Sequence, residues 1–453
     1  MGTLSQRFAE FSEGLRYPDL PGDVTAYAKL LMLDLFGAAL AARDTPERSA
    51  ALAGCKALAP ILDDGAALWG TGLRTTPGAA ALFNGILAHT LELDDFNGVD
   101  HSGAVVVPAL LAAAATRPDM DGERAIEGMV VGYEIGRRVL EAAGGYRQHN
   151  STGWHTTGTC GSFAAAAATA KALKLDAGAT ANALGLAGSF TGGLWAFIAD
   201  GSMSKRYHAG RAAETGIVAA TLASNGLTGP AEIFEASWGG YFSTYAPGFP
   251  AEPLLDGLGE GFRLSKAGVK PYACCRGIHS SVDAILELRT QRGDPDRLSA
   301  VEIVCTPGQI AQLGRVRPST RLQAQFSLSY SVAVAMVTGK ATLAEFVEPW
   351  LSDAAVEEVE RKVRLIEATD LPLGWEPRLT LRFADGHTST AQVAEARGGP
   401  SNPLSETEIR EKYRGLAEPV LGTDTARTLE ETVMSLEKPG NLGRTIALLG
   451  RAT

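Results

Sequence analysis

A short polar stretch between two long apolar segments sets the strongest limit on how this chain can fold. Residues 88–108 read AHTLELDDFNGVDHSGAVVVP, with carboxylates and imidazoles close together. The flanking segments 78–93 and 104–115 are rich in Ala, Leu and Val and predict two apolar helices. Burying charged groups between such helices is costly unless the groups pair, bind a ligand or react. The stretch therefore predicts a functional loop inside a helical core.

Most of the N-terminal half shows the helical spacing of apolar residues. Apolar residues make up 45% of the chain and charged residues 20%, which together with 52 glycines favours closely packed helices. Residues 24–42 contain no proline and predict a buried helix. Further helices are expected at 4–16, 47–58, 122–143, 161–175, 177–187 and 206–225, with a strand at 66–69 and loops at 144–159 and 188–205.

The character of the sequence changes near residue 260. Strands are predicted at 262–269, 300–305, 378–383 and 388–394, with helices between them at 277–290, 324–338 and 352–361. The Asp-Gly pair at 385–386 predicts a hairpin between the last two strands. Helical patterns return at 405–417, 423–434 and 440–449. The predicted fold class is mainly α: a large all-helical domain (1–262, with 400–453 returning to it) and an inserted, smaller α+β lid domain (263–399).

Charge and cysteine content argue against several classes of protein. The formal net charge is −10, so no nucleic-acid partner is expected, because phosphate binding needs a basic field. Five cysteines at scattered spacings predict reduced thiols in the cytoplasm rather than a disulfide framework. The N-terminus does not read as a secretory signal, and no apolar run is expected to reach the ~20 residues that span a bilayer, so no membrane partner is expected.

The acidic loop supplies the first candidate site. His101 is the candidate for acid–base chemistry, with Glu92 or Asp94 beside it. The alternative is structural, since a carboxylate can cap a helix end and His89 can be a satisfied core residue. No H-x-x-x-H spacing is present, so no metal is predicted.

Two more candidates precede predicted helices. His155 and Thr157 lie in GWHTTGT (153–159), where free backbone N–H groups attract anions, although an ordinary N-cap run looks the same. Lys205 lies in DGSMSKR (200–206) and could act as a general base or a carboxylate clamp. A basic helix start opposes the helix dipole and hints at an anion, but a solvated helix start is the simpler interpretation.

The fourth candidate is KPYACCRGIH (270–279), at a predicted strand-to-helix turn of the insertion. It contains Lys270, Arg276 and His279, with Cys275 between them. Cations on a lid would suit a pocket for an acidic substrate, although free cysteine pairs usually serve packing.

Taken in order, these segments resemble the MmgE/PrpD family, which includes 2-methylcitrate dehydratases, cis-aconitate decarboxylases and iminodisuccinate epimerases. The resemblance covers about residues 5–440. It is carried by H-x-L-[DE]-x-D-D (89–95), H-x-G-A (101–104), G-W-H-x-T (153–157), D-G-S-x-x-K (200–205), H-A-G-R-A-A (208–213), K-P-Y-x-x-C (270–275) and F-S-x-x-Y (326–330).

The resemblance implies a cleft between a helical domain and a lid domain, a homodimer, and action on small di- and tricarboxylates without an organic cofactor or obligatory metal. The positions that match family active-site positions are His101, His155, Lys205, Lys270 and Tyr330. Two departures weigh against a decarboxylase. Glu92 stands where the family usually has Asp, and Cys275 stands where the cis-aconitate decarboxylases have His; the nearest histidine is His279.

Reactions of this kind share one difficult step, the cleavage of a bond at the carbon next to a carboxylate, which builds charge that cations and donors must stabilise. The predicted catalytic residues are His101, Lys205, His155, Tyr330 and Asp94, with Asp94 orienting His101. The predicted substrate-binding residues are Glu92, Thr157, Lys270, Cys275, Arg276 and His279.

The expected activity is that of a cofactor-independent lyase similar to 2-methylcitrate dehydratase, in which Tyr330 or His155 would protonate the leaving hydroxyl. An epimerase, with Lys205 and His101 on opposite sides of one carbon, and a decarboxylase are the alternatives. A non-catalytic carboxylate-binding protein on the same fold is the rival class.

Overall fold

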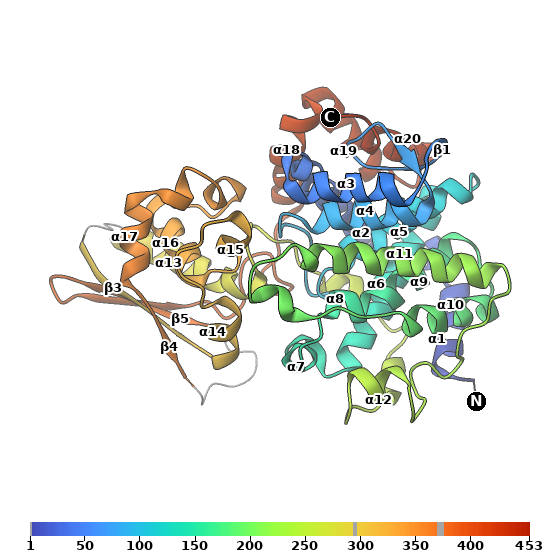
Figure 1. Cartoon of the computed structure of the whole chain (residues 1–453), viewed down its shortest axis with the longest axis horizontal. Helices are drawn as coiled ribbons and strands as arrows, with labels where there is room; N and C mark the ends of the chain where they lie inside the picture. The colour runs from blue at the N-terminus through green and yellow to red at the C-terminus, as the bar shows by residue number, and fades with distance from the viewer. Residues whose placement is uncertain (1, 293–296, 369–375) are drawn as a thin grey trace.

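The computed structural model describes residues 2–292, 297–368 and 376–453, and Figure 1 shows a large helical body beside a smaller part that contains a sheet. The helices of the body from the N-terminal segment are α1 (Leu4–Gly14), α2 (Gly22–Ala41), α3 (Pro46–Leu58), α4 (Pro77–His89), α5 (Ser102–Ala113), α6 (Gly122–Ala142), α7 (Gly145–Ser151), α8 (Thr156–Thr159), α9 (Gly161–Ala172), α10 (Ala177–Ser189), α11 (Ser204–Ser224) and α12 (Tyr241–Tyr245). A two-stranded ribbon, β1 (Ile61–Ala67) and β2 (Arg74–Thr75), lies at the edge of this body.

Helix α5 is the centre of the body. All of its residues are buried, and it packs against α4, α6, α9 and α11. Small residues let these helices approach closely: a Cβ added at Gly85 of α4 would lie 2.8 Å from the Cα of Gly210 of α11. This contact fixes the end of α4 relative to the start of α11, and both ends carry residues of the candidate site.

The C-terminal segment returns to the helical body. It forms α18 (Glu406–Leu421), α19 (Thr423–Met434) and α20 (Asn441–Leu449), and both α18 and α19 pack against α2. The Lys412 ammonium of α18 pairs with Asp34 of α2 at 2.7 Å and donates to the main-chain oxygen of Leu93 at 2.6 Å. The end of the chain thus supports the acidic loop directly.

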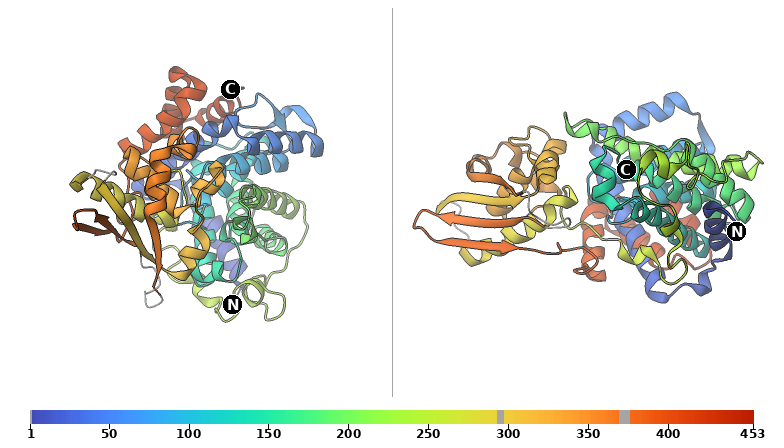
Figure 2. Two further views of the ribbon diagram at one scale, coloured as in Figure 1. Left: turned by 60° about the vertical axis from the view of Figure 1, so that its left-hand side comes forward. Right: turned by 90° about the horizontal axis from the view of Figure 1, so that it is seen from below.

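The smaller part, called the sheet domain below, is built on a four-stranded sheet with the order β4-β3-β5-β6. Strand β3 (Leu298–Cys305) pairs in parallel with β4 (Val363–Glu367) and antiparallel with β5 (Arg378–Phe383), which forms a hairpin with β6 (Thr388–Gln392). Helices α13 (His279–Arg292), α16 (Leu328–Thr338) and α17 (Ala354–Lys362) cover one face of the sheet (Figures 1 and 2). Two short helices, α14 (Pro307–Leu313) and α15 (Arg321–Gln325), complete the domain.

The predicted strand at 262–269 is wrong. Residues Arg263–Lys266 form a 3₁₀ helix, and only Gly268 pairs with another extended segment, through two hydrogen bonds to Phe96 of 2.8 and 3.0 Å. The backbone N–H of Arg263 donates instead to the Glu134 carboxylate at 2.6 Å. The N–H groups of Ser265 and Ala267 donate to main-chain oxygens within the same segment, so a 3₁₀ turn takes the place of a strand ladder.

Other boundaries differ less. The predicted helix 324–338 is interrupted between α15 and α16, because the hydroxyl of Ser327 accepts the N–H of Tyr330 at 3.2 Å and caps the start of α16. The short strand expected at 66–69 belongs to a strand that begins at Ile61. The predicted loop 144–159 contains α7 and α8, and β4 and α14 were not predicted.

One helix among the described residues, Gly22–Asp44, is long and apolar enough to cross a membrane by length and composition. The expectation that no segment reaches this length is therefore wrong. In its most apolar window 78% of the residues are buried inside the protein, and α2 packs against α4, α5 and α18.

Candidate active site

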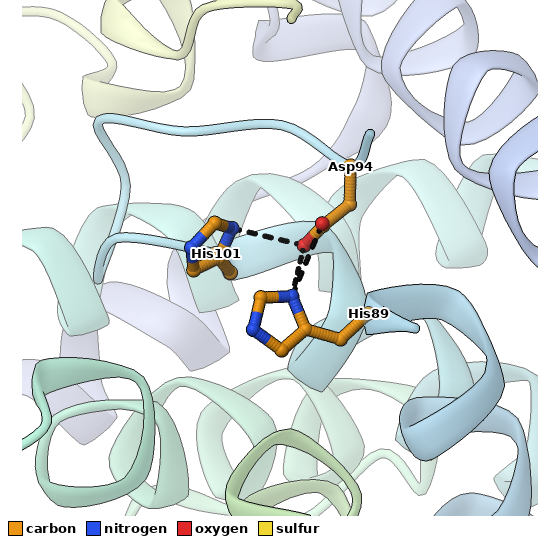
Figure 3. Close-up of side chains that lie close together, drawn as sticks. All are labelled: His89, Asp94 and His101. Atoms are coloured by element: carbon orange, nitrogen blue, oxygen red, sulfur yellow. Dashed lines mark hydrogen bonds and ion pairs between the residues drawn. The ribbon is translucent and has the colours of Figure 1, made fainter. Parts of the chain in front are cut away.

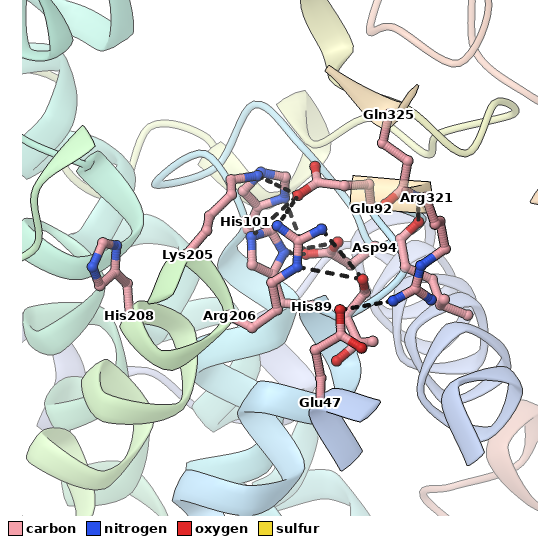
Figure 4. A network of polar contacts seen from close by, with 12 residues as sticks. Glu47, His89, Glu92, Asp94, His101, Lys205, Arg206, His208, Arg321 and Gln325 are labelled. Atoms are coloured by element: carbon pink, nitrogen blue, oxygen red, sulfur yellow. Dashed lines mark hydrogen bonds and ion pairs between the residues drawn. The ribbon is translucent and has the colours of Figure 1, made fainter. Parts of the chain in front are cut away.

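Glu92 lies at the centre of a cluster of cations where the helical body meets the sheet domain (Figure 4). Its backbone is left-handed (φ 56°), and its carboxylate is fully buried. Lys205 Nζ donates to it at 2.5 Å and Lys270 Nζ at 3.1 Å, and Arg206 Nη1 lies 3.3 Å away. Three cations converge on this one carboxylate, an arrangement that suits a ligand with several carboxylates.

The ion pairs of Glu92 with Lys205 and Lys270 shift the pKa values of all three groups. Burial alone would raise the pKa of Glu92, but Lys205 and Lys270 hold that pKa well below its usual range. Burial lowers the pKa of Lys205, and Glu92 opposes this shift. For Lys270 the attraction of Glu92 and Asp94 outweighs burial, so its pKa is raised. Glu92 thus favours the charged form of both lysines, and only for Lys205 does burial outweigh it.

Asp94 bridges two histidines beside this cluster (Figure 3). Its carboxylate lies 3.0 Å from Nδ1 of His89 and 3.0 Å from Nδ1 of His101. Burial would raise the pKa of Asp94, but the two histidines hold it well below its usual range. Burial lowers the pKa of His89 to about 3, so this ring is neutral. Nδ1 of His101 also lies 3.0 Å from the main-chain oxygen of Asp95, so the oxygens of Asp94 and Asp95 both favour a proton on Nδ1, and its Nε2 lies 3.3 Å from the Asp100 carboxylate.

The ligand atoms of His89, Asp94 and His101 lie within 4.8 Å of one another, so these three residues could hold a metal ion. The sequence predicted no metal, because the three positions do not match a familiar spacing. Their convergence results from the tight turn after α4, where Glu92 and Asp100 both adopt positive φ.

Asp95 anchors the same loop. Tyr133 Oη donates to its carboxylate at 2.9 Å and the backbone N–H of Gly103 at 2.8 Å. Burial and the neighbouring Asp94 raise the pKa of Asp95 well above its usual range. Asp95 therefore ties the loop to α5 and α6, and its neighbour Asp94 faces the histidines.

His155 and Thr157 approach the cluster from the start of α8. The imidazole of His155 is buried, and its Nδ1 lies 3.0 Å from Nδ1 of His208. Burial, Lys205 and His208 lower the pKa of His155 well below its usual range, so the ring is neutral. Its Nε2 and the Thr157 hydroxyl are buried without a hydrogen-bond partner among the described residues. Unpaired buried polar atoms of this kind are expected where a ligand binds.

The predicted residues of the sheet domain divide into two groups. Cys275 is buried near Lys205 and Glu92; burial raises the pKa of its thiol, and Lys205 opposes this shift. Arg276 instead pairs with Glu395 at 3.0 Å.

The other two predicted side chains of this domain have partners of their own. His279 lies 3.2 Å from the main-chain oxygen of Cys274, and Tyr330 donates to the main-chain oxygen of Glu345 at 2.7 Å inside the sheet domain. The structure thus places Cys275 at the cluster and gives Arg276 and Tyr330 other partners, while Nδ1 of His279 is buried without a hydrogen-bond partner among the described residues.

Two cavities open on either side of the loop that contains Gly201 and Ser202. A cavity of about 480 Å³ is lined by Arg206, Phe326 and residues of α14. A larger groove of about 1220 Å³ is lined by Leu91, Lys412 and residues of α15. The candidate site thus lies at the junction of the two parts of the chain.

Two family models match consecutive parts of this chain. The MmgE/PrpD N-terminal domain matches residues 6–253, and the MmgE/PrpD C-terminal domain matches residues 272–438. The chain belongs to the MmgE/PrpD family. The sequence resemblance is therefore confirmed.

Its relatives in the MmgE/PrpD family are similar over almost their whole length. The cis-aconitate decarboxylase-like protein oryM of Aspergillus oryzae is 30% identical, with 99% of this chain and 97% of the relative covered. The cis-aconitate decarboxylase of Aspergillus terreus is 28% identical (98% and 96%), and that of Homo sapiens is 27% identical (96% and 92%). The chain is accordingly an enzyme of the MmgE/PrpD family.

Sequence reasoning did not select three side chains that complete this MmgE/PrpD site. Arg206 was set aside as part of a basic helix start, although its neighbour Lys205 was chosen. Phe326 lies 5.1 Å below Lys205 Nζ, and Gln325 donates to the main-chain oxygens of Leu91 and Ala273 at 2.7 and 2.9 Å. Arg206 and Phe326 lie in motifs that the sequence had marked, and that membership was the available signal, whereas Gln325 lies one residue before the F-S-x-x-Y motif.

Proposed function

We propose that this chain is a cofactor-independent decarboxylase of a small unsaturated tricarboxylate of the cis-aconitate type. The observation that carries the proposal is the buried Glu92 carboxylate with three cations around it. Similarity over the whole chain to proteins named as cis-aconitate decarboxylases supports this reaction, and it replaces dehydration as our first choice.

The chemistry places clear demands on the site. When CO₂ leaves a carbon next to a C=C bond, the electron pair moves across the double bond to the carbon beside another carboxylate. Negative charge then spreads onto that carboxylate, and the carbon accepts a proton. Lys205, Lys270 and Arg206 are positioned to hold these carboxylates and to stabilise the charge as it develops.

Two groups are proposed for the proton. His155 Nε2 is buried and free of protein partners among the described residues, and the Thr157 hydroxyl beside it in sequence would bind a carboxylate oxygen. His101, oriented by Asp94, is the second candidate for proton exchange.

A dehydratase is the second candidate function. It is favoured by Cys275, which stands five positions after Lys270 where the cis-aconitate decarboxylases have His. In this reaction His101 would remove the proton next to a carboxylate, and His155 would protonate the leaving hydroxyl.

Proton NMR in D₂O separates these functions. Purified enzyme is incubated with cis-aconitate, 2-methylcitrate, citrate and iminodisuccinate in turn. Release of CO₂ from cis-aconitate with one deuterium in the product is expected. Loss of water from 2-methylcitrate or citrate without CO₂ would replace decarboxylation by dehydration, and deuterium exchange alone would identify an epimerase. Binding without any turnover would refute both lyase functions.

We also propose that the protein is a homodimer. Tyr207, Val218 and Leu222 of α11 are 43–50% exposed although they are large and apolar. Sedimentation equilibrium is expected to give twice the chain mass of 47.4 kDa, and the mass of one chain would refute the proposal.

A further inference from the structure

Two neutral histidines face each other through their Nδ1 atoms at the edge of the site. Nδ1 of His155 lies 3.0 Å from Nδ1 of His208, with the ring centroids 5.1 Å apart. His208 projects from α11 one turn after Lys205 (Figure 4). Burial, reinforced by Lys205, lowers the pKa of His208 to about 4 and that of His155 well below its usual range.

This contact restricts the proton positions. A hydrogen bond between two Nδ1 atoms of neutral imidazoles needs one N–H and one lone pair. If His208 donates, then His155 carries its single N–H proton on Nε2, and His208 Nε2 is bare. If His155 donates, then its Nε2 is bare, and His208 carries a proton on Nε2. The two states differ in which ring nitrogen of His155 and of His208 carries the proton.

The two ends of the histidine pair differ in their access to solvent. The His155 ring is fully buried and packs against Trp195 and Phe197 at centroid distances of 5.2 and 5.7 Å. His208 is only half-buried. Gly193 packs against the pair, since a Cβ there would lie 3.4 Å from Nδ1 of His208. A proton can thus enter at His208 and leave at His155 Nε2, which is buried without a hydrogen-bond partner among the described residues.

We propose that His208 is a positioning residue that relays a proton from solvent through His155 to the substrate carbon. The inference rests on the decarboxylation proposed above. That reaction breaks the C–C bond to CO₂, forms a C–H bond and consumes one proton from solvent.

The proton balance of the relay is complete. His155 Nε2 gives its proton to the carbon that holds the electron pair, His155 Nδ1 takes the proton of His208 Nδ1, and His208 Nε2 takes one from water. After the product leaves, each ring returns to its starting tautomer by exchanging protons with water before the next turnover. Neither ring has to become an imidazolium, a form that burial and the charge of Lys205 both disfavour.

Two substitutions separate a relay from a purely structural hydrogen bond. His208→Asn keeps an amide where Nδ1 was, so it can still hold His155, but it cannot accept a proton on one side and release one on the other. His208→Ala removes both functions. The relay predicts that kcat on the decarboxylation substrate falls roughly 10- to 100-fold in both variants, with substrate affinity nearly unchanged. Added imidazole should restore turnover in His208→Ala.

Full turnover in His208→Asn with a loss only in His208→Ala would overturn the relay, because a hydrogen bond would then suffice. Full turnover in both variants would overturn it as well. Circular dichroism and thermal unfolding identify a variant that has not folded.

A measurement on the unmodified enzyme does not depend on turnover. Nitrogen-15 NMR of labelled histidine should show both rings neutral at pH 7, with one N–H shared between the two Nδ1 atoms. Two rings that both carry their proton on Nε2 would overturn the relay. If the substrate panel shows no CO₂ release but the shared proton is present, then the proposed reaction fails and the histidine pair remains.

Discussion

Replacement of Glu92 by Gln tests the central feature of the site, the buried carboxylate that holds two lysines. At separations of 2.5 and 3.1 Å and an effective dielectric constant of ~20, each attraction is on the order of 5 kcal/mol before desolvation is subtracted. Removal of one partner from a buried ion pair typically destabilises a protein by about 3–5 kcal/mol. We expect a loss of this size in the apparent free energy of unfolding, measured by urea titration at pH 7.

The same substitution should change the pH dependence of activity. Burial already lowers the pKa of Lys205, and Glu92 opposes this shift, so the pKa of Lys205 must fall further in Glu92→Gln. Activity that needs the ammonium form is present below this pKa and is lost as the pH rises through it. The high-pH limb of the kcat/KM profile should therefore move to lower pH in the variant.

The free energy of unfolding of the variant should change with pH in the opposite direction from its activity. When the folded-state pKa of a lysine lies below its unfolded value, the unfolded chain binds more protons between the two values, and folding becomes more favourable as the pH rises. The destabilisation by Glu92→Gln should therefore be largest near neutral pH and should shrink as the pH approaches 10.

Two variants serve as controls for this experiment. Glu92→Asp keeps the charge and should retain the high-pH limb. Glu214→Gln breaks a surface pair with Arg211 on α11 and should change stability by less than about 1 kcal/mol. If the high-pH limb of Glu92→Gln coincides with that of the wild type, the electrostatic reasoning is refuted.

Three further expectations follow from the contacts of individual side chains. Asp94→Asn removes the negative charge that lies 3.0 Å from Nδ1 of His101, so kcat should fall on the order of 10³-fold with little change in KM, as steady-state kinetics would measure; an unchanged kcat would contradict this role. Tyr330→Phe loses its hydrogen bond to Glu345 and should cost about 1 kcal/mol of unfolding free energy without lowering kcat, and a large loss of kcat would restore Tyr330 as a catalytic candidate. Exhaustive chelation should leave turnover intact, whereas added Zn²⁺ should inhibit reversibly by binding His89 with Asp94 and His101; loss of turnover on chelation would indicate a required metal.

Local pattern was sufficient to predict much of the fold. The apolar spacing of 24–42 and the Asp-Gly pair at 385–386 describe features that form within a few residues, and both are present as α2 and the β5–β6 hairpin. Strand β4 was missed because it follows α17 without a turn signal and owes its place to a parallel partner 62 residues earlier in the chain, as the pair Val301 and Val363 shows. The false strand at 262–269 had the right alternation, but Arg263–Lys266 form a 3₁₀ helix, and the N–H of Arg263 donates to Glu134.

The candidate site was predictable in its residue types but not in their contacts. The density of charge in an apolar context singled out Glu92, Asp94 and His101, which the structure brings together with Lys205 and Lys270. No pattern along the chain could show that Glu92 would take a left-handed backbone and face both lysines. Nor could the motif around Tyr330 show that its hydroxyl points into the sheet domain, since the direction of a side chain on a helix depends on what packs against it.

The contact between Lys412 and the acidic loop has a consequence for biosynthesis. The main-chain oxygen of Leu93 accepts a hydrogen bond from Lys412, which lies 319 residues further along the chain. The N–H of Gly70 likewise donates to the main-chain oxygen of Leu449. During vectorial synthesis the ribosome releases the loop long before these partners exist, and contacts of such sequence separation form late. The proposed catalytic side chains are therefore synthesised before the helices that hold the acidic loop in place. A premature stop before α18 would yield a protein that has every proposed catalytic residue but no ordered site.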